Sequence, residues 1–222
     1  HPFVPGHVAT LVAGRIADVP VLCSLGRVHL YEGYTPTEVT FPVRVLAALG
    51  VETLVVTNAA GGLNPAFARG DLMLVRDHVF LPGFAGLSPL VGRERGSEVV
   101  FLPTADAYDE ELRRLAWREA RALAVAVHEG VYVMVHGPQY ETQAEVAWLR
   151  HMGGDAVGMS SVPEVIVARA LGLRVLGLSY ITNTLQAHGA AELQHDDVLA
   201  AARDAASGLA DLLQAMCARL DR

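Results

Sequence analysis

Short apolar runs rich in β-branched residues recur along the chain, and polar clusters or helical patterns separate them. They cover residues 8–14, 19–30, 53–58, 71–79, 130–137, 155–159 and 174–183. Runs of this length and composition are typical of buried strands. Because helical stretches lie between several of them, the pattern predicts an α/β fold with a central mixed, mostly parallel sheet flanked by helices. We expect one domain over residues 1–222.

Polar residues also mark where helices begin. Thr35, Thr142 and Ser161 each open a Ser/Thr-x-x-Glu sequence, the capping box, in which the first side chain and the glutamate satisfy free backbone N–H groups. Asp109 is the predicted cap of a helix over residues 109–128, and residues 196–220 should form a closing helix. Residues 87–100, rich in Pro, Gly and charges, are expected to form a mobile loop.

Composition and charge narrow the class of protein. The chain has 52% hydrophobic and 18% charged residues, which suits a globular core. Its net charge of −7 argues against a nucleic-acid partner, because phosphate backbones attract basic surfaces. Since there is no long apolar run and no signal peptide, we expect no membrane partner and a cytoplasmic setting.

Two further features concern cysteines and the first residue. Cys23 and Cys217 have no zinc-ligand or disulfide-framework spacing, so we expect no metal. The sequence starts at His1 without a methionine, so we expect an N-terminal segment to be missing from it.

Polar clusters follow four of the apolar runs. They comprise residues 57–62, 136–141, 159–161 and 182–184. In open α/β sheets, ligands bind beyond the carboxyl ends of strands, so these clusters are the candidate binding residues. Residues 58–62 are small enough for backbone to approach a ligand, although taken alone a tight turn is the better interpretation. No GxGxxG or GxxxxGK[ST] motif supports a dinucleotide or P-loop site.

The segment from Gly26 to Tyr34 places Arg27, His29 and Tyr31 at every second position. In an extended chain these side chains share one side, where a cation and an imidazole could bind an anion. Glu32 could hold the His29 ring only if the extended conformation breaks near Tyr31, which we therefore predict.

The cluster at residues 159–161 could add hydroxyl groups to the same anion. Ser160 is the serine expected to face a ligand, whereas Ser161 is better explained as a helix cap.

Glu141, Tyr140 and Asn183 could recognise a flat heterocycle by accepting, stacking and donating. Singly, helix-dipole stabilisation explains Glu141 and a turn explains Asn183. Their convergence with an anion site and the apolar Met159 indicates a phosphorylated ligand, or phosphate together with a nucleoside.

With these residues assembled, the sequence resembles the trimeric purine nucleoside phosphorylases and, more broadly, methylthioadenosine phosphorylase. The resemblance rests on the ordered blocks VPGH, GRVHLYEGY, TFPVRV, VVTNAAGGLNP, GDLMLVRDH, GPQYET, GMSSVPEVIVAR and ITN. It implies reversible phosphorolysis of purine nucleosides to free base and (deoxy)ribose 1-phosphate, by a homotrimer without a cofactor and with phosphate as co-substrate.

The resemblance also implies a role for each matching residue. The phosphate ligands are His7, Arg27, His29, Ser160 and the backbone of Ala59. The purine contacts are Glu141, Asn183, Tyr140, Ala60, Gly61 and Val157. The ribose contacts are Tyr31, Met159, His195 and, from a neighbouring subunit, Phe101, which matches only approximately. The catalytic group is Asn183, His29, Glu32 and Glu141. The family's glycine-rich phosphate loop with its serine is absent, so the phosphate site in this sequence is incomplete.

Two alternatives remain open. Methylthioadenosine phosphorylases resemble this chain but have Asp where it has Asn183, so Asn183 and His195 favour 6-oxopurine nucleosides with a free 5′-hydroxyl: inosine, guanosine and their deoxy forms. The other alternative is a non-catalytic nucleoside-binding protein, which would have no use for a full set of phosphate ligands.

Overall fold

The computed structural model describes residues 8, 10–91, 101–185 and 195–220, with the side chains of residues 195–207 excepted. Within them, the central sheet consists of β3 (Thr53–Gly62), β4 (Leu72–Phe80), β5 (Val127–Met134), β6 (Ala156–Gly158) and β7 (Arg174–Thr184). The strand order is β3-β6-β5-β4-β7, and β7 pairs back onto β3 to close the sheet. Pairs β3–β7, β4–β5 and β5–β6 are parallel and the other two antiparallel, so the sheet is mixed, as predicted.

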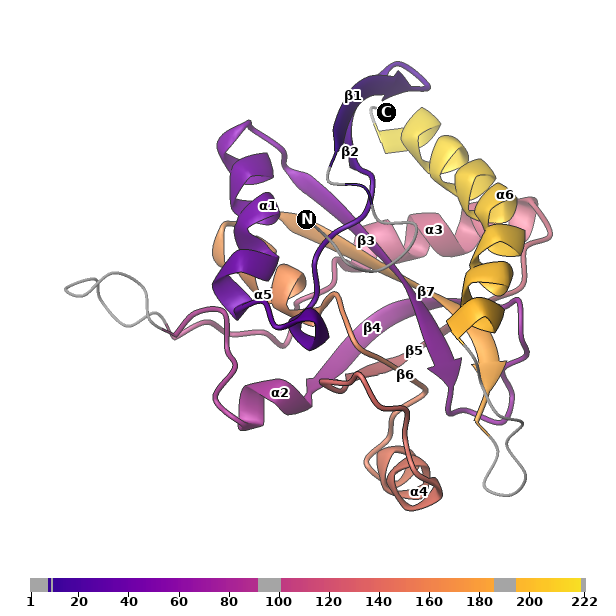
Figure 1. Cartoon of the computed structure of the whole chain (residues 1–222). Coiled ribbons are helices and arrows are strands. Elements are labelled where there is room, and N and C mark those ends of the chain that lie inside the picture. The colour runs from indigo at the N-terminus through magenta and orange to yellow at the C-terminus, as the bar shows by residue number, and fades with distance from the viewer. Residues whose placement is uncertain (1–7, 9, 92–100, 186–194, 221–222) are drawn as a thin grey trace.

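Helices pack against both sides of this sheet (Figure 1). Helix α1 (Pro36–Ala48) lies beside α5 (Val162–Ala170), and α5 packs on β3 and β7. Helix α3 (Glu110–Ala122) packs on β4 and on α6 (His195–Leu220), which also covers β7. Apolar side chains fill both layers, such as Val165 and Ile181 on one side and Leu112 and Leu212 on the other. Burial of these side chains holds the sheet between its helices.

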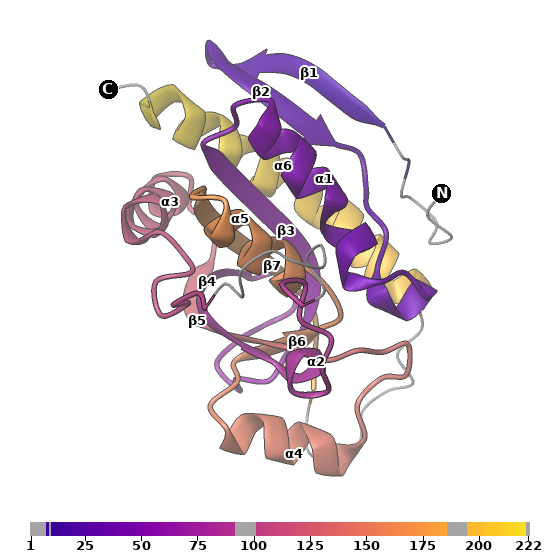
Figure 2. The same cartoon turned by 90° about the vertical axis from the view of Figure 1, so that its left-hand side faces the viewer.

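Two elements lie at opposite ends of the molecule. The antiparallel hairpin of β1 (Leu11–Ile16) and β2 (Val19–Ser24) forms a separate two-stranded sheet that contacts α6. Figure 2 shows α4 (Gln143–His151) at the other end, beyond β5 and β6. The short helix α2 (Leu81–Phe84), which the sequence pattern did not predict, follows β4 directly.

The strands differ from their predicted extents in three places. The apolar run over residues 19–30 is a strand only to Ser24, because the backbone turns at Gly26, whose φ is 92°. Strand β3 continues through residues 57–62, so the tight turn expected there is wrong. Strand β7 likewise contains residues 182–184. A register shift at Ala60/Gly61 interrupts the β3–β7 ladder, and such bulges re-aim side chains near binding sites.

The predicted helix starts are correct, but one of the predicted caps, Ser161, does not cap its helix. Thr35 and Thr142 form complete capping boxes, and Asp109 accepts a hydrogen bond from the Leu112 N–H at 2.9 Å. Ser161 precedes α5 but makes no capping bond, so its predicted capping box is wrong. Its φ of 77° also differs from the extended conformation that a capping residue usually has. Helix α3 ends at Ala122, short of residue 128, because the chain has entered β5 by Val127.

Two negative findings apply to the described residues only. None of the helices there is both long and apolar enough to cross a membrane. No group of three or more His, Cys, Asp or Glu side chains in this part of the chain is arranged to hold a metal ion. Most of the loop predicted over residues 87–100 lies outside the described residues.

Candidate active site

Arg27 meets the turn between β6 and α5. One terminal guanidinium nitrogen donates to Ser160 Oγ at 2.9 Å, to Ser161 Oγ at 2.9 Å and to the Thr57 carbonyl at 3.1 Å. The backbone of Ala59 is close by, since a Cβ added to Gly158 would lie 3.1 Å from the Ala59 carbonyl oxygen. Arg27, Ser160 and Ala59, predicted as phosphate ligands, therefore do lie together. A guanidinium beside hydroxyl groups suits a tetrahedral anion.

Sequence patterns missed Ser161 and Asn58 as parts of this cluster. The Ser161 hydroxyl is buried and accepts from both Arg27 and the Asn58 side-chain amide, the latter at 3.0 Å. Two donors to one oxygen fix its hydroxyl, which lies 3.4 Å from Ser160 Oγ. Both residues lie in the polar clusters at residues 57–62 and 159–161, and adjacency to Ala59 and Ser160 was a further signal. The capping-box pattern gave Ser161 a simpler explanation.

His29 and Glu32 are joined across a turn. The chain is extended at His29 and then forms a 3₁₀ helix over Leu30–Glu32, which confirms the predicted break near Tyr31. Glu32 Oε1 lies 2.7 Å from His29 Nδ1 and accepts from the His29 backbone N–H at 2.8 Å. Both side chains are about 95% buried, with 5% of His29 and 4% of Glu32 exposed. The carboxylate therefore fixes the imidazole ring through one of its nitrogens.

Tyr31 stacks on the His29 ring, with centroids 4.7 Å apart and planes 9° from parallel. Burial, helped by the negative charge of Glu32, raises the pKa of the Tyr31 hydroxyl to about 12. The phenol is therefore neutral at physiological pH and presents an apolar ring with a hydroxyl at its edge. Such a group can form a wall against a sugar.

Asn183 lies on β7 opposite Gly61 of β3, just past the register shift. The Thr182 hydroxyl lies 2.9 Å from the Asn183 side-chain oxygen and 3.3 Å from the Ala60 carbonyl oxygen, and it can donate to either. The amide nitrogen of Asn183 is a donor. Gly61 also pairs with Val157 of β6, and Val157 and Ala60 are buried. Gly61 thus lies between Val157 and Asn183 in the sheet, whereas the Ala60 side chain packs into the core cluster that contains Ile181.

Tyr140 and Glu141 lie in the loop between β5 and α4. They border a small hollow of about 80 Å³ whose lining residues are Leu81, Val135, His136, Gly137, Gln139, Tyr140, Glu141, Glu145, Trp148 and Leu149. Burial raises the pKa of the Glu141 carboxyl above its ordinary value, and the Glu145 carboxylate adds to the shift. Met159 contacts Gly137 of the same loop so closely that a side chain there would overlap its sulfur. Among the described residues, no hydrogen bond joins Glu141 to Asn183.

The structure does not place two of the predicted residues relative to this cluster, and a third is on the surface. His7 lies outside the described residues, and of His195 the structure gives only its place as the first residue of α6. Phe101 is 90% exposed on the surface.

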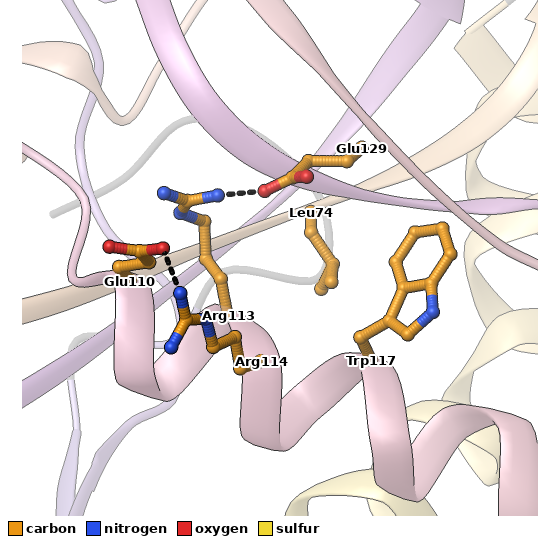
Figure 3. A pocket seen from close by; sticks show the side chains of 6 residues that line it. All are labelled: Leu74, Glu110, Arg113, Arg114, Trp117 and Glu129. Carbon is orange, nitrogen blue, oxygen red and sulfur yellow. Dashed lines mark hydrogen bonds and ion pairs between the residues drawn. The ribbon is translucent and has the colours of Figure 1, made fainter.

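A second hollow, of about 230 Å³, lies between α3 and strands β4 and β5 (Figure 3). Its lining residues are Leu74, Glu110, Arg113, Arg114, Trp117 and Glu129. Both arginines are engaged in ion pairs, Arg113 with Glu129 and Arg114 with Glu110. It contains none of the predicted site residues.

Known proteins similar to this chain agree on one family. A family model described as the phosphorylase superfamily matches residues 1–218. Purine nucleoside phosphorylase 1 of Bacillus subtilis is 47% identical over 98% of this chain and 80% of its own length. The Bos taurus purine nucleoside phosphorylase is 50% identical over 98% of this chain and 77% of its own.

Solved structures agree with the sequence matches. The Schistosoma mansoni purine nucleoside phosphorylase in complex with inosine superposes with a TM-score of 0.93 at 38% identity, covering 100% of this chain and 80% of that one. A structure of the same enzyme in complex with adenosine superposes with a TM-score of 0.90 at 38% identity, over 96% of this chain and 78% of that one.

The chain therefore belongs to the phosphorylase superfamily. Its relatives place it among the purine nucleoside phosphorylases of that family, which are pentosyltransferase enzymes.

Proposed function

We propose that the chain catalyses reversible phosphorolysis of 6-oxopurine nucleosides, namely inosine, guanosine and their deoxy forms, to the free base and (deoxy)ribose 1-phosphate. The observation that carries the 6-oxo preference is the Thr182–Asn183 hydrogen bond of 2.9 Å. Because the Asn183 oxygen already has the Thr182 hydroxyl within hydrogen-bond distance, we assign the amide nitrogen, a donor, to the base. A 6-oxopurine offers acceptors at O6 and N7, whereas a 6-amino group is itself a donor.

Phosphate is the proposed nucleophile. Arg27, Ser160, His29 and the Ala59 backbone hold it on one side of the ribose, together with His7, and Glu32 keeps the His29 ring in place. Positioning the nucleophile next to the bond that breaks removes much of the entropic barrier. The bound dianion also stabilises positive charge that develops on the sugar as the glycosidic bond lengthens.

The base leaves with negative charge. The Asn183 amide donates to N7 and O6, and these hydrogen bonds strengthen as the charge grows, so they favour the transition state over bound substrate. Glu141 accepts from the other edge of the base, and Tyr140, Ala60, Gly61 and Val157 contact its faces and rim. Tyr31, Met159 and His195 line the ribose.

Other parts of the proposal concern the whole protein. We expect no metal ion and no organic cofactor, with inorganic phosphate as co-substrate. A homotrimer in the cytoplasm, with Phe101 reaching a neighbouring site, completes the proposal, and it excludes nucleic acid and membranes as partners.

The experiment is a base-release assay of inosine, guanosine, adenosine and methylthioadenosine, each with and without phosphate. We expect release from inosine and guanosine only when phosphate is present, with ribose 1-phosphate as the second product. Turnover restricted to adenosine or methylthioadenosine would reject the 6-oxopurine preference. Equal release without phosphate would indicate hydrolysis, and no release from any of them would indicate a binding protein.

A further inference from the structure

Glu164 is a buried carboxylate that no step of the proposed reaction uses. It is the third residue of α5 and only 4% exposed. Among the described residues, neither of its carboxylate oxygens has a partner at hydrogen-bond geometry. The N–H groups of Ser161 and Glu164 point toward the carboxylate and favour its charged form, but burial has the larger effect and raises the pKa of Glu164 above its ordinary value. A carboxylate left this way in a protein interior is costly, so its presence calls for a reason.

The cation that faces Glu164 is Arg27. Glu164 Oε1 lies 3.4 Å from one terminal nitrogen of the Arg27 guanidinium, while the other terminal nitrogen makes the bonds to Ser160, Ser161 and Thr57. The Arg27 side chain is 20% exposed and that of Glu164 is 6% exposed, so the carboxylate lies on the inner side of the pair. The guanidinium is thus held between a buried negative charge and the hydroxyl groups at the site.

Two tyrosines are also titratable neighbours of Glu164. Tyr132 and Tyr108 are close enough for the Glu164 charge to raise their pKa values further, and burial, the larger cause, already raises both. Both phenols are therefore neutral at physiological pH, and neither supplies a counter-charge. The Tyr132 hydroxyl also accepts a long hydrogen bond from the Ser160 backbone N–H, at 3.5 Å. The strongest electrostatic contact of Glu164 in the described part of the chain is accordingly the one with Arg27.

We propose that Glu164 is a positioning residue for phosphate: its carboxylate fixes the plane and the depth of the Arg27 guanidinium so that Arg27 and Ser160 meet the same anion. This inference rests on the proposed function, which makes Arg27 and Ser160 phosphate ligands. Glu164 does not touch the anion. It acts by limiting the orientations of a long side chain, which lowers the entropy lost when phosphate binds.

The test replaces Glu164 by two uncharged residues of similar length, Glu164→Gln and Glu164→Met. Removing one partner of a buried ion pair is often destabilising, so thermal melting of each variant verifies that it is folded. We expect the KM for phosphate to rise about tenfold, the size typical of losing one member of a contacting pair. The KM for inosine should change by less than about twofold, which lies within the additivity expected of distant sites.

A double-mutant cycle separates positioning from a general structural effect. In an Arg27→Lys background, Glu164→Gln should raise the phosphate KM by no more than about twofold, because the group through which it acts has gone. The matched control is Glu119→Gln. Glu119 is equally buried, at 4% exposure, and contacts Arg118 at 2.9 Å and Arg219 at 3.2 Å on α3 and α6, away from the site. Its loss should leave the phosphate KM unchanged.

The outcomes distinguish this inference from the proposed function. If the wild-type protein needs no phosphate for base release, the proposed function fails, whatever the variants do. If the wild type needs phosphate but folded Glu164 variants keep its phosphate KM, or lower it, positioning by Glu164 is wrong. A lower KM would mean that the carboxylate only repels the anion. Equal effects of Glu164→Gln in the wild-type and Arg27→Lys backgrounds would also reject it.

Discussion

Ser160 and Ser161 are adjacent and carry the same hydroxyl group, but their surroundings differ. Ser160 is half-buried and accepts from Arg27, whereas Ser161 is buried and accepts from both Arg27 and Asn58. Glu141 and Asn183 are similarly defined by what surrounds them. Burial raises the pKa of the Glu141 carboxyl, and the Thr182 hydroxyl lies within hydrogen-bond distance of the Asn183 oxygen. Substitutions of Glu141 and Asn183 therefore test how the protein recognises the purine.

Replacing Asn183 tests the donor to the base. Asn183→Ala should lower kcat for inosine by about 10²- to 10³-fold, the usual cost of losing a donor to developing negative charge. Asn183→Asp, which can only accept when ionised, should lower the inosine rate and raise the ratio of adenosine to inosine turnover. Steady-state kinetics with both nucleosides measures this. Asn64→Ala is the control, because that amide bonds to Asp155 at 2.8 Å outside the site. Near-normal inosine turnover in Asn183→Ala would remove Asn183 from the mechanism.

Because the pKa of Glu141 is raised, we expect the activity on inosine to depend on pH. If the base needs an ionised Glu141, kcat/KM for inosine should fall as pH drops through a pKa above the ordinary glutamate value. Glu141→Gln should lower kcat/KM at neutral pH and abolish that acidic limb. A pH–rate profile of both proteins measures it, and an unchanged limb in the variant would assign it to another group.

The same shift affects stability. A folded-state pKa above the unfolded one means that the folded protein binds this proton more tightly, so stability decreases as pH rises through that interval. At pH values above both pKa values, Glu141 is ionised in the folded and the unfolded protein, and the desolvation of its charge destabilises the folded state in full. Glu141→Gln should therefore raise the melting temperature at neutral pH while lowering activity, which thermal melting at pH 4 and pH 8 measures. A lower melting temperature at neutral pH would contradict this.

At the scale of elements, the local sequence gives the helix starts but not every cap. The Thr142 side chain accepts from the Glu145 N–H at 3.3 Å, and Glu145 accepts in return from the Thr142 N–H at 2.7 Å. These bonds span only three residues, so the sequence pattern predicts them reliably. Ser161 has the same pattern, but the contacts of its hydroxyl come from Arg27 and Asn58, 134 and 103 residues away. Two identical motifs therefore make different contacts.

Alanine substitutions at these two caps should separate the functions. Thr142→Ala should reduce the free energy of unfolding by about 1 kcal/mol, the usual value of an N-cap side chain, and leave the phosphate KM unchanged. Ser161→Ala should raise the phosphate KM, because Arg27 and Asn58 lose a shared acceptor, with no loss of a capping bond. Denaturant titration and phosphate kinetics measure both. A phosphate KM that stays at the wild-type value in Ser161→Ala would contradict the second expectation.

At the scale of the whole molecule, the sheet brings the site together. Strands β3, β6 and β7 are neighbours although α3, α4 and α5 separate them in sequence, and they carry Ala59, Val157 and Asn183. Phe101, in contrast, is 90% exposed, which suits a side chain that meets another subunit but is also typical of a surface residue. If the protein is a trimer, as proposed, the exposed Phe101 side chain meets another subunit.

Sedimentation and kinetics together test the trimer. The wild-type protein should sediment at three times the protomer mass. Phe101→Ala should raise the KM for inosine with the phosphate KM unchanged, because only a ribose contact is lost. Phe84→Ala, at a residue 83% exposed, is the matched control and should change neither. A monomeric but fully active protein would reject the proposed role of Phe101.

Local sequence patterns were enough to predict the α/β class, the approximate places of strands β1 to β7, the helix starts at Pro36, Glu110 and Gln143, and the break at Leu30. Alternation, capping and turns depend on residues close in the chain, so a pattern contains what is needed to predict them. The match of ordered blocks added the family.

Which side chains meet depends on how the strands and helices pack in the folded chain. In the folded protein, β3 and β7 continue through the polar residues 57–62 and 182–184. The register of the two strands shifts beside Asn183. The packing also buries Glu164 against Arg27 and brings the Ser161 hydroxyl to the Arg27 guanidinium. These contacts join residues more than a hundred positions apart, and their energies depend on burial and on the geometry of partners. No local pattern contains that information, which is why the capping box predicted at Ser161 was wrong.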